Sequence, residues 1–244
     1  RSKAFAQHLV DNGFERVYQI EKGYKAFRNL AHSEFEKECD LKIIGGYTGS
    51  AKTEILNHIK NTTDIQVIDL ERIANHKGSS FGGIDQGIQP TVEQFENNLY
   101  WEWKELDLEK EIWIEDESRA IGAVMVPEPL YMKIRSQHVY FIDIPRMERS
   151  KFLVEGYGSS HINELKDGIL RISKRLGGLN TKNAIQLLEE GNLVEVASLA
   201  LKYYDKYYEK GVSKRDKSLV TRIKLETTNP IINSEEILKI VHGK

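Results

Sequence analysis

The strongest chemical signal in the sequence is a glycine-rich stretch, Gly45-Gly46-Tyr47-Thr48-Gly49-Ser50-Ala51-Lys52-Thr53. It follows a short apolar run and precedes a segment with helical spacing, which is the context of a phosphate-binding loop. Such a loop turns backbone N–H groups toward an anion at the positive end of a helix dipole. We therefore predict that Gly46–Thr53 binds phosphate. Lys52 would bind the terminal phosphate oxygens, and the Thr53 hydroxyl would be available to a metal ion.

One residue departs from the phosphate-loop pattern G-x-x-x-x-G-K-[ST], because Ala51 stands where glycine is expected. Its methyl group restricts the backbone and points toward the place of a phosphate, which counts against a bound nucleotide. The alternative interpretation of the whole stretch is a glycine-rich turn that has a lysine beside it by chance.

A second group of reactive side chains ends an apolar run, Ile112-Trp113-Ile114-Glu115-Asp116-Glu117-Ser118-Arg119. A carboxylate that follows a strand near a phosphate loop can position a metal ion or activate a water molecule. We assign that role to Asp116 or Glu117. The alternative is a charged strand end whose side chains form surface ion pairs.

A third group lies in the polar segment Asn75–Gly83, which contains His76 and Lys77. Ligands of open parallel sheets bind at the carboxyl ends of the strands, so this segment is predicted to neighbour the phosphate loop. A single histidine such as His76 is either structural or catalytic, and the sequence leaves both interpretations open.

The three segments can form one site only if the strands before them end at the same edge of a sheet. From Leu41 onward, apolar runs of strand length alternate with helical patterns, which is typical of a parallel sheet with crossover helices. The predicted strands are Leu41–Ile44, Ile65–Leu70, Glu111–Ile114, Val139–Ile144 and Leu219–Leu225; the predicted helices are Thr53–Lys60, Thr91–Leu106, a helical region over 148–208 broken at Gly177-Gly178 and Gly191-Asn192, and a last helix that Ser234 caps. The predicted fold class is α/β, with a P-loop-type, mostly parallel sheet, flanking helices and a C-terminal helical portion.

The first 40 residues follow another pattern: a helix, a short strand over Arg16–Ile20, a second helix after Gly23 and a charged linker, His32–Asp40. The 244 residues include no apolar stretch of about 18 residues, which excludes a membrane span. The single cysteine, Cys39, excludes a disulfide framework and a multi-cysteine zinc cluster, so the cytoplasm is the expected location. The carboxylates around Cys39 would raise its thiol pKa, and nothing indicates that it is a nucleophile.

Charge is distributed unevenly along the chain, although the net charge is only -2. Residues 146–224 contain 16 Lys and Arg against 10 Asp and Glu. This excess predicts either an RNA-binding surface or the solvated faces of long helices. The tyrosines at positions 203, 204, 207 and 208 have helical spacing and are interpreted as helix-packing residues rather than base-stacking platforms.

Taken in order, these segments resemble the tRNA 2-selenouridine synthase family. The resemblance rests on Gly46–Leu56, Asp69-Leu70-Glu71, Asn75–Gly82, Gln89-Pro90, Phe95-Glu96-Asn97, Trp113–Arg119, Ile121-Gly122, Arg175–Gly178 and Tyr203–Tyr207. It covers nearly the whole chain, and the Asn-His-Lys-Gly-Ser and Glu-Asp-Glu-Ser-Arg blocks together make it specific.

The resemblance implies a division of the chain into three parts. Residues 1–35 would be the C-terminal remnant of a rhodanese domain and residues 36–145 a P-loop α/β domain. Residues 146–244 would form a mainly helical portion whose last strand and helix complete that domain. In the family the rhodanese cysteine lies just before an Arg-Ser pair, and this sequence begins at Arg1-Ser2. The family's missing rhodanese half would then be a partner, in the same polypeptide or another, and this chain alone would lack the selenium-transfer step.

The resemblance also implies a transferase that acts on wobble-position 2-thiouridine in tRNA. Geranyl diphosphate would alkylate the sulfur, and selenophosphate would then replace the S-geranyl group with selenium. Lys52 would stabilise the leaving diphosphate, and Asp116–Arg119 with His76 would surround the thiouridine. The residues expected at the tRNA are Lys77, Arg171, Lys174 and Arg175. No cofactor or protein-bound metal is firmly predicted, although Mg²⁺ is a candidate.

Two other classes of function remain open at the level of sequence. A small-molecule kinase or NTPase would also need the phosphate loop and the acidic strand end, but it would favour glycine at the position of Ala51. A tRNA-binding protein without catalytic activity would be consistent with the missing rhodanese cysteine.

Overall fold

A five-stranded parallel sheet forms the centre of the molecule in the computed structural model, which describes residues 2–157 and 161–243. Its strands are β1 (Leu41–Gly46), β2 (Gln66–Ile68), β3 (Ile112–Glu115), β6 (Val139–Asp143) and β7 (Val220–Lys224). They lie in the order β2-β3-β1-β6-β7, and every neighbouring pair is parallel. The inner strands are continuous apolar runs because helices cover both faces of the sheet. The predicted α/β fold class is confirmed.

Two apolar layers enclose the sheet. On one face, α3 (Lys52–Thr62) and α11 (Pro230–His242) pack with the strands into a cluster that includes Ile55, Trp113 and Ile237. On the other face lie α2 (Tyr24–Glu36), α5 (Val92–Lys104) and α6 (Glu128–Ser136), with Phe35 and Trp103 in their core. The sheet is therefore held rigidly between helices, and the loops at its carboxyl edge are built on a fixed base.

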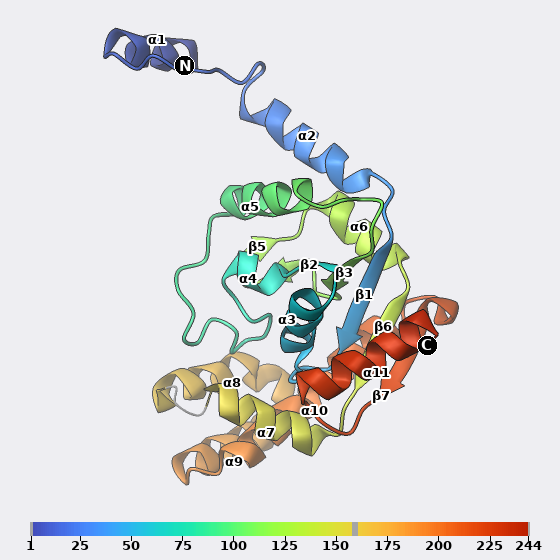
Figure 1. Cartoon of the computed structure of the whole chain (residues 1–244). Coiled ribbons are helices and arrows are strands. Elements are labelled where there is room, and N and C mark those ends of the chain that lie inside the picture. The colour runs from blue at the N-terminus through green and yellow to red at the C-terminus, as the bar shows by residue number, and fades with distance from the viewer. Residues whose placement is uncertain (1, 158–160, 244) are drawn as a thin grey trace.

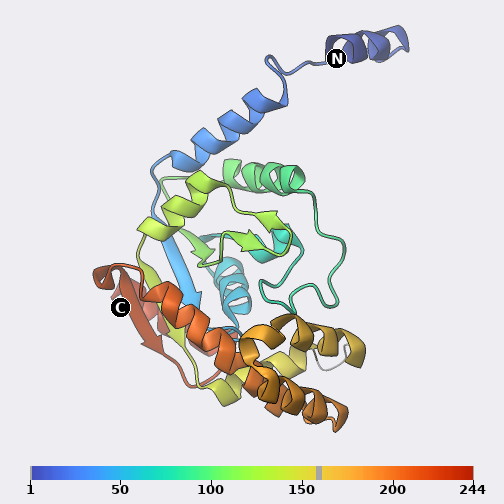
Figure 2. The same cartoon turned by 180° about the vertical axis from the view of Figure 1, so that it is seen from behind.

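A helical portion lies beyond the carboxyl ends of the strands, at the bottom of Figures 1 and 2. It consists of α7 (Arg146–Tyr157), α8 (Ile162–Leu176), α9 (Gly178–Glu189) and α10 (Leu193–Val212). Its apolar residues, among them Ile169, Ile172 and Leu188, form a core separate from those of the sheet. Helix α10 has 20 residues and reaches from this portion back toward the phosphate loop.

The N-terminal helices differ from each other in their packing. Helix α1 (Ser2–Asp11) has no buried residue and projects away from the rest of the chain (Figure 1). Helix α2 belongs to the α/β core, because Ala31 and Phe35 are buried there and Arg28 forms a two-bond ion pair with Glu96. The proposed division after residue 35 falls in the last turn of α2.

Several local predictions were wrong. Residues 16–20 form no strand, and α2 occupies most of the stretch interpreted as a linker. Ser234 lies inside α11; the cap of that helix is Asn229, whose side chain accepts the N–H groups of Ile231 and Ile232. Elements that the sequence did not predict are α4 (Leu70–Ala74), the hairpin of β4 (Ala120–Ile121) and β5 (Val124–Met125), helix α6 (Glu128–Ser136) and the short η1 (Lys217–Leu219).

Strand β2 is shorter than predicted because Asp69 ends it by accepting the N–H of Arg72 as the cap of α4. Among the helices in the described part of the chain, none combines the length and the apolar character that a membrane span requires.

Candidate phosphate and substrate site

The glycine-rich stretch connects β1 to α3, as the sequence predicted, and α3 begins with Lys52. Ala51 occupies the left-handed region at φ 55° and ψ 32°, where a residue with a Cβ costs about 1–2 kcal/mol. Gly49 also has a positive φ of 80°, and a Cβ there would lie 3.0 Å from Arg149 O and from Leu153 Cγ. Surrounding contacts must therefore hold the loop in its bent form.

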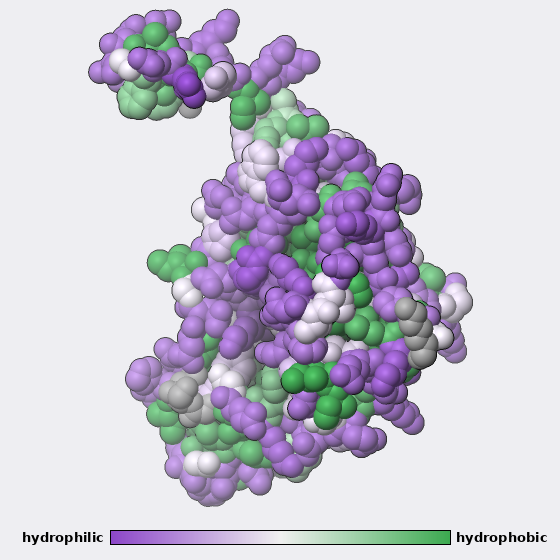
Figure 3. All heavy atoms as spheres, viewed as in Figure 1, coloured by the Kyte–Doolittle hydropathy of each residue, from purple (hydrophilic) through white to green (hydrophobic). Residues whose placement is uncertain are grey.

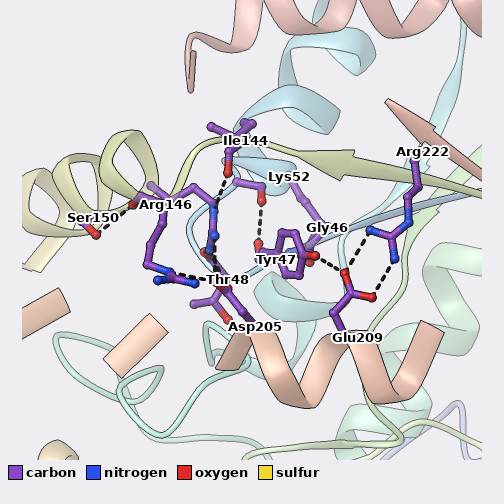
Figure 4. Close-up of polar contacts among 12 residues, drawn as sticks. Gly46, Tyr47, Thr48, Lys52, Ile144, Arg146, Ser150, Asp205, Glu209 and Arg222 are labelled. Atoms are coloured by element: carbon purple, nitrogen blue, oxygen red, sulfur yellow. Dashed lines mark hydrogen bonds and ion pairs between the residues drawn. The ribbon is translucent and has the colours of Figure 1, made fainter. Parts of the chain in front are cut away.

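Those contacts come from the C-terminal helices (Figure 4). The Tyr47 hydroxyl donates to Glu209 on α10, and Glu209 also forms a two-bond ion pair with Arg222 on β7. Burial and the bond to Glu209 raise the pKa of Tyr47 to about 12, so its hydroxyl stays protonated.

On the α7 side of the loop, the buried guanidinium of Arg149 donates to Thr48 O at 3.1 Å and to Asp205 Oδ1 at 2.9 Å. Arg146 shares the same Asp205 carboxylate at 3.0 Å. Residues of α7 and α10 therefore hold the loop in place, which the sequence alone did not reveal.

Three buried carboxylates gather beside Lys52 and Thr53. The Thr53 hydroxyl lies 2.7 Å from Glu115 Oε1 and 3.2 Å from Glu71 Oε2. Burial and the neighbouring Glu117 raise the pKa of Glu71 to about 8, and burial with Glu71 raises that of Glu115 well above its ordinary value. Burial also raises the pKa of Glu117, which the Lys52 charge opposes.

The oxygens beside Thr53 suit a magnesium ion. Glu115 is fully buried, and its Oε2 has no hydrogen-bond partner among the described residues. Hydroxyl and carboxylate oxygens are preferred Mg²⁺ ligands, and Mg²⁺ usually takes only one or two carboxylates and completes its shell with water and phosphate. No group of three or more His, Cys, Asp or Glu is placed to hold a metal within residues 2–157 and 161–243. Thr53 and Glu115 therefore fit Mg²⁺ only together with a phosphorylated ligand.

The structure separates the acidic residues that the sequence grouped together. Glu117 lines the pocket of the phosphate loop. Asp116 instead accepts from Arg215 at 2.5 Å and from Arg135 at 3.2 Å, away from that pocket. Arg119 is half-exposed and pairs with Glu128 at 3.4 Å, so the structure does not bring it to the phosphate loop.

His76 contacts the backbone of its own loop, which follows α4. Its Nδ1 accepts the N–H of Gly78 at 3.1 Å, and burial with the Arg171 charge lowers its pKa. It is not among the residues that line the pocket, whereas the adjacent Lys77 and Gly78 are. In this structure, the contact that His76 makes with Gly78 supports the loop, which favours the structural interpretation.

Two pockets adjoin at this edge of the sheet. The polar one contains the loop from Thr48 to Thr53, with Glu71, Lys77, Glu117 and Tyr208. The second is a cleft that opens to solvent among α7, α8, α9 and α10, and its walls are mostly aliphatic and aromatic. Figure 3 shows apolar surface over this helical portion at the lower end of the molecule. The residues that line both pockets are Thr48, Ser79, Leu153 and Tyr157.

Sequence reasoning missed several residues of this site. Glu71 and Glu115 stood in the quoted motifs without a role, and Tyr157 carried no signal. Tyr208 was interpreted as helix packing, but its ring centroid lies 5.9 Å from Lys52 Nζ, and burial raises the pKa of its hydroxyl well above the ordinary value. Tyr204 is buried as a packing residue would be, although its hydroxyl also accepts the N–H of Ser80.

The predicted tRNA contacts divide into two kinds. Arg171 and Arg175 of α8 make contacts inside the chain: Arg171 donates to Ser80 O at 2.9 and 3.1 Å, and Arg175 donates to the Tyr203 hydroxyl at 2.9 Å. Lys174 faces a shallow groove between α8 and α9, where Lys182 also lies.

The carboxylate cluster predicts how stability depends on pH. A carboxyl whose pKa is raised on folding binds its proton more tightly in the folded state, so stability is fully present below the ordinary carboxyl pKa near 4.5 and is lost as pH rises toward about 8. One pKa unit corresponds to about 1.4 kcal/mol, so we expect a fall of a few kcal/mol across this window.

Urea unfolding between about pH 5 and pH 8, in EDTA, measures this fall. Glu115→Gln removes one buried charge and is expected to flatten the curve, while Glu226→Gln at an exposed position should leave it unchanged. A stability that rises with pH over this range would contradict the assignment.

Comparison with known proteins identifies a family and several similar sequences. The family model of the tRNA 2-selenouridine synthase AAA domain matches residues 39–237. The tRNA 2-selenouridine synthase of Sulfurovum sp. (strain NBC37-1) is 31% identical over 91% of this chain and 68% of its own length. The synthases of Aeromonas salmonicida and Pseudomonas fluorescens are 29% and 31% identical over 85% of this chain, and 63% and 64% of their own lengths are covered. The chain thus spans about two thirds of the length of these three relatives.

Proposed function

Because this chain belongs to the tRNA 2-selenouridine synthase family, we propose that it is a tRNA-modifying transferase that acts on 2-thiouridine at the wobble position. In the proposed reaction, geranyl diphosphate alkylates the sulfur, and selenophosphate then replaces the S-geranyl group with selenium. The observation that carries the proposal is that the anion-binding loop and an apolar cleft share a wall. A donor with an anionic head and a hydrocarbon tail matches this pair of pockets.

Each part of the donor has a counterpart in the chain. The amides of the loop and the Lys52 ammonium would hold the diphosphate, while Leu201 and other residues of the cleft would bury the isoprenoid chain. In the transfer, the bond between geranyl C1 and oxygen breaks and its electron pair stays on the diphosphate. A positive charge fixed at that oxygen stabilises the charge that develops there.

Thr53 and Glu115 are the residues that would hold Mg²⁺ beside the diphosphate. When bound, the ion would supply further neutralisation of the leaving group. The protein's own part is to keep the loop and its lysine in place through Tyr47 and Arg149.

Mass spectrometry of digested tRNA tests the proposed function. Thiolated tRNA is incubated with the chain and geranyl diphosphate, and S-geranyl-2-thiouridine is the expected product. Turnover of ATP without any modified nucleoside would favour a kinase or NTPase instead. Binding of tRNA without a product would favour a non-catalytic tRNA-binding protein.

The selenium step is proposed to need a thiol other than Cys39. That thiol is half-buried, and burial raises its pKa, with further increases from Glu38 and Asp40 against the opposing charge of Lys133. A thiol with a raised pKa is a weak nucleophile at neutral pH. With selenophosphate added to the same assay, we expect geranylated thiouridine and no selenouridine; selenouridine formed by this chain alone would contradict this.

A charge-reversal variant tests where tRNA binds. Lys174 and Lys182 face the groove between α8 and α9, so Lys174→Glu with Lys182→Glu avoids the arginines that hold the fold. We expect weaker binding to all tRNAs alike and a salt dependence reduced by roughly one counterion for each lysine–phosphate pair that no longer forms. Electrophoretic shift assays at several salt concentrations measure both, and unchanged binding would place the RNA elsewhere.

A further inference from the structure

The loop between α4 and α5 is fastened to the helical portion at several points. The hydroxyl of Tyr204 accepts the N–H of Ser80 at 3.1 Å, and Arg171 donates twice to the carbonyl oxygen of the same residue. The ring of Phe81 packs so closely on Gly168 that a Cβ there would collide with it. These contacts fix the backbone on the C-terminal side of Lys77 and Gly78.

The same loop contributes to both pockets. Phe81 lines the apolar cleft, Lys77 lines the polar pocket, and Ser79 lines both. One rigid loop therefore spans the places of the hydrocarbon tail and of the anionic head. A side chain of this loop can act on the head without a rearrangement of the backbone.

Lys77 is the second lysine of the polar pocket, beside Lys52. Its Nζ lies 5.0 Å from the ring centroid of Tyr157, and neither lysine forms an ion pair with a described residue. Both ammonium groups are therefore available to an anion.

Carboxylates line the same pocket as Lys52 and Lys77. Glu71 and Glu117 converge on Gly78, because a Cβ at that residue would lie 2.6 Å from Glu71 Oε1 and 3.1 Å from Glu117 Oε2. Several negative charges on a diphosphate would enter a pocket that already contains these acidic groups. A second cation in the pocket offsets that repulsion wherever the carboxylates are charged.

We propose that Lys77 is the second phosphate-binding cation of the site, so that Lys52 and Lys77 each bind one phosphoryl group of a diphosphate. A ligand with a single phosphoryl group occupies the loop and Lys52 and leaves Lys77 unused. The inference rests on the proposed function for the identity of the diphosphate donor. It also assigns Lys77 to the donor rather than to the tRNA, where the sequence had placed it.

Calorimetric titration of Lys77→Ala tests the assignment with three probes: inorganic diphosphate, geranyl diphosphate and inorganic phosphate. We expect at least a tenfold loss of affinity for both diphosphates, because a charge-assisted contact disappears, and less than a twofold change for phosphate. Lys77→Arg should retain most of the diphosphate affinity. Lys60→Ala, an exposed lysine on α3, is the matched control and should change none of the three.

Three results would overturn the assignment: an unchanged diphosphate affinity, an equal loss for phosphate and diphosphate, or a loss of tRNA affinity with diphosphate binding intact. The outcome is separate from that of the proposed function. A wild-type chain that binds inorganic diphosphate but yields no geranylated tRNA would refute the proposed reaction, and the Lys77 comparison would still decide the role of this residue. Lys77 is exposed, so equal thermal midpoints of variant and wild type establish that the fold is intact.

Discussion

Replacing Lys52 with alanine is expected to weaken the binding of geranyl diphosphate about a hundredfold. The lysine begins α3 and lies in the polar pocket, with its Nζ 3.5 Å from Gly46 O. Loss of a charge-assisted contact typically costs roughly 1.5–3 kcal/mol. We expect the upper end, about 3 kcal/mol or two orders of magnitude in affinity, because Glu71 and Glu117 then face the diphosphate without this charge.

The measurement is a calorimetric titration with geranyl diphosphate, and Lys60→Ala on the exposed side of the same helix is the control. Removal of Lys52 also leaves Glu71 and Glu117 without a neighbouring cation, so the thermal midpoint of the variant should be compared at about pH 6, below the pKa of about 8 of Glu71. Wild-type affinity in a folded Lys52→Ala variant would refute the phosphate-loop assignment.

Filling the apolar cleft is expected to weaken the binding of geranyl diphosphate without changing the binding of inorganic diphosphate. Ala197 lines the cleft on α10, and a tryptophan in its place would occupy the volume proposed for the isoprenoid tail. Each buried CH₂ contributes about 0.8 kcal/mol, so excluding even four carbons costs about 3 kcal/mol, or roughly a hundredfold in affinity. Binding of inorganic diphosphate should stay as in the wild type, because the polar pocket is untouched.

Competition between geranyl diphosphate and inorganic diphosphate measures both affinities in one series. Leu179→Trp, an exposed position on α9 outside the cleft, is the control for adding an indole to the helical portion. An equal loss of affinity for the two ligands would indicate a distorted phosphate loop, and no loss for either would place the hydrocarbon chain outside the cleft.

The sequence predicted secondary structure correctly where the signal lies within one short segment of the chain. The strand–turn–helix unit of the glycine-rich loop was predicted correctly because its three parts follow one another directly, and the parallel sheet because apolar runs alternate with helical patterns. Asn229 was missed as the cap of α11, although Pro230 at the first helical position is itself a start signal.

Ala51 is a residue whose unusual position the sequence showed, but not the contacts that stabilise it. The sequence showed that a methyl group replaces a hydrogen in the loop, and the left-handed conformation at φ 55° is the conformation for which glycine is expected. The contacts that hold Ala51 in this conformation come from residues distant in the sequence. Tyr47 and Arg149 hold the loop through residues of α10, more than 50 positions away in the chain.

The assignment of roles among the carboxylates required the tertiary structure. Successive residues after a strand point in different directions, so adjacency in Glu115-Asp116-Glu117 could not show that Glu115 meets Thr53 while Asp116 meets Arg215. The side chain that a strand end presents depends on which elements pack around it.

The sequence by itself determined the fold class, the glycine-rich connection between β1 and α3, and the family, because each depends on residue order within short segments. The sequence also predicted that the segment of Lys77 neighbours the glycine-rich loop of Lys52, but only the tertiary structure decided that an apolar cleft adjoins the pocket that both lysines line. The walls of the cleft come from the loop after α4 and from α7, α8, α9 and α10. The helical patterns of these segments predict buried faces but not which faces meet. Pairing of those faces is set by packing between distant segments, and a single sequence carries no direct record of it.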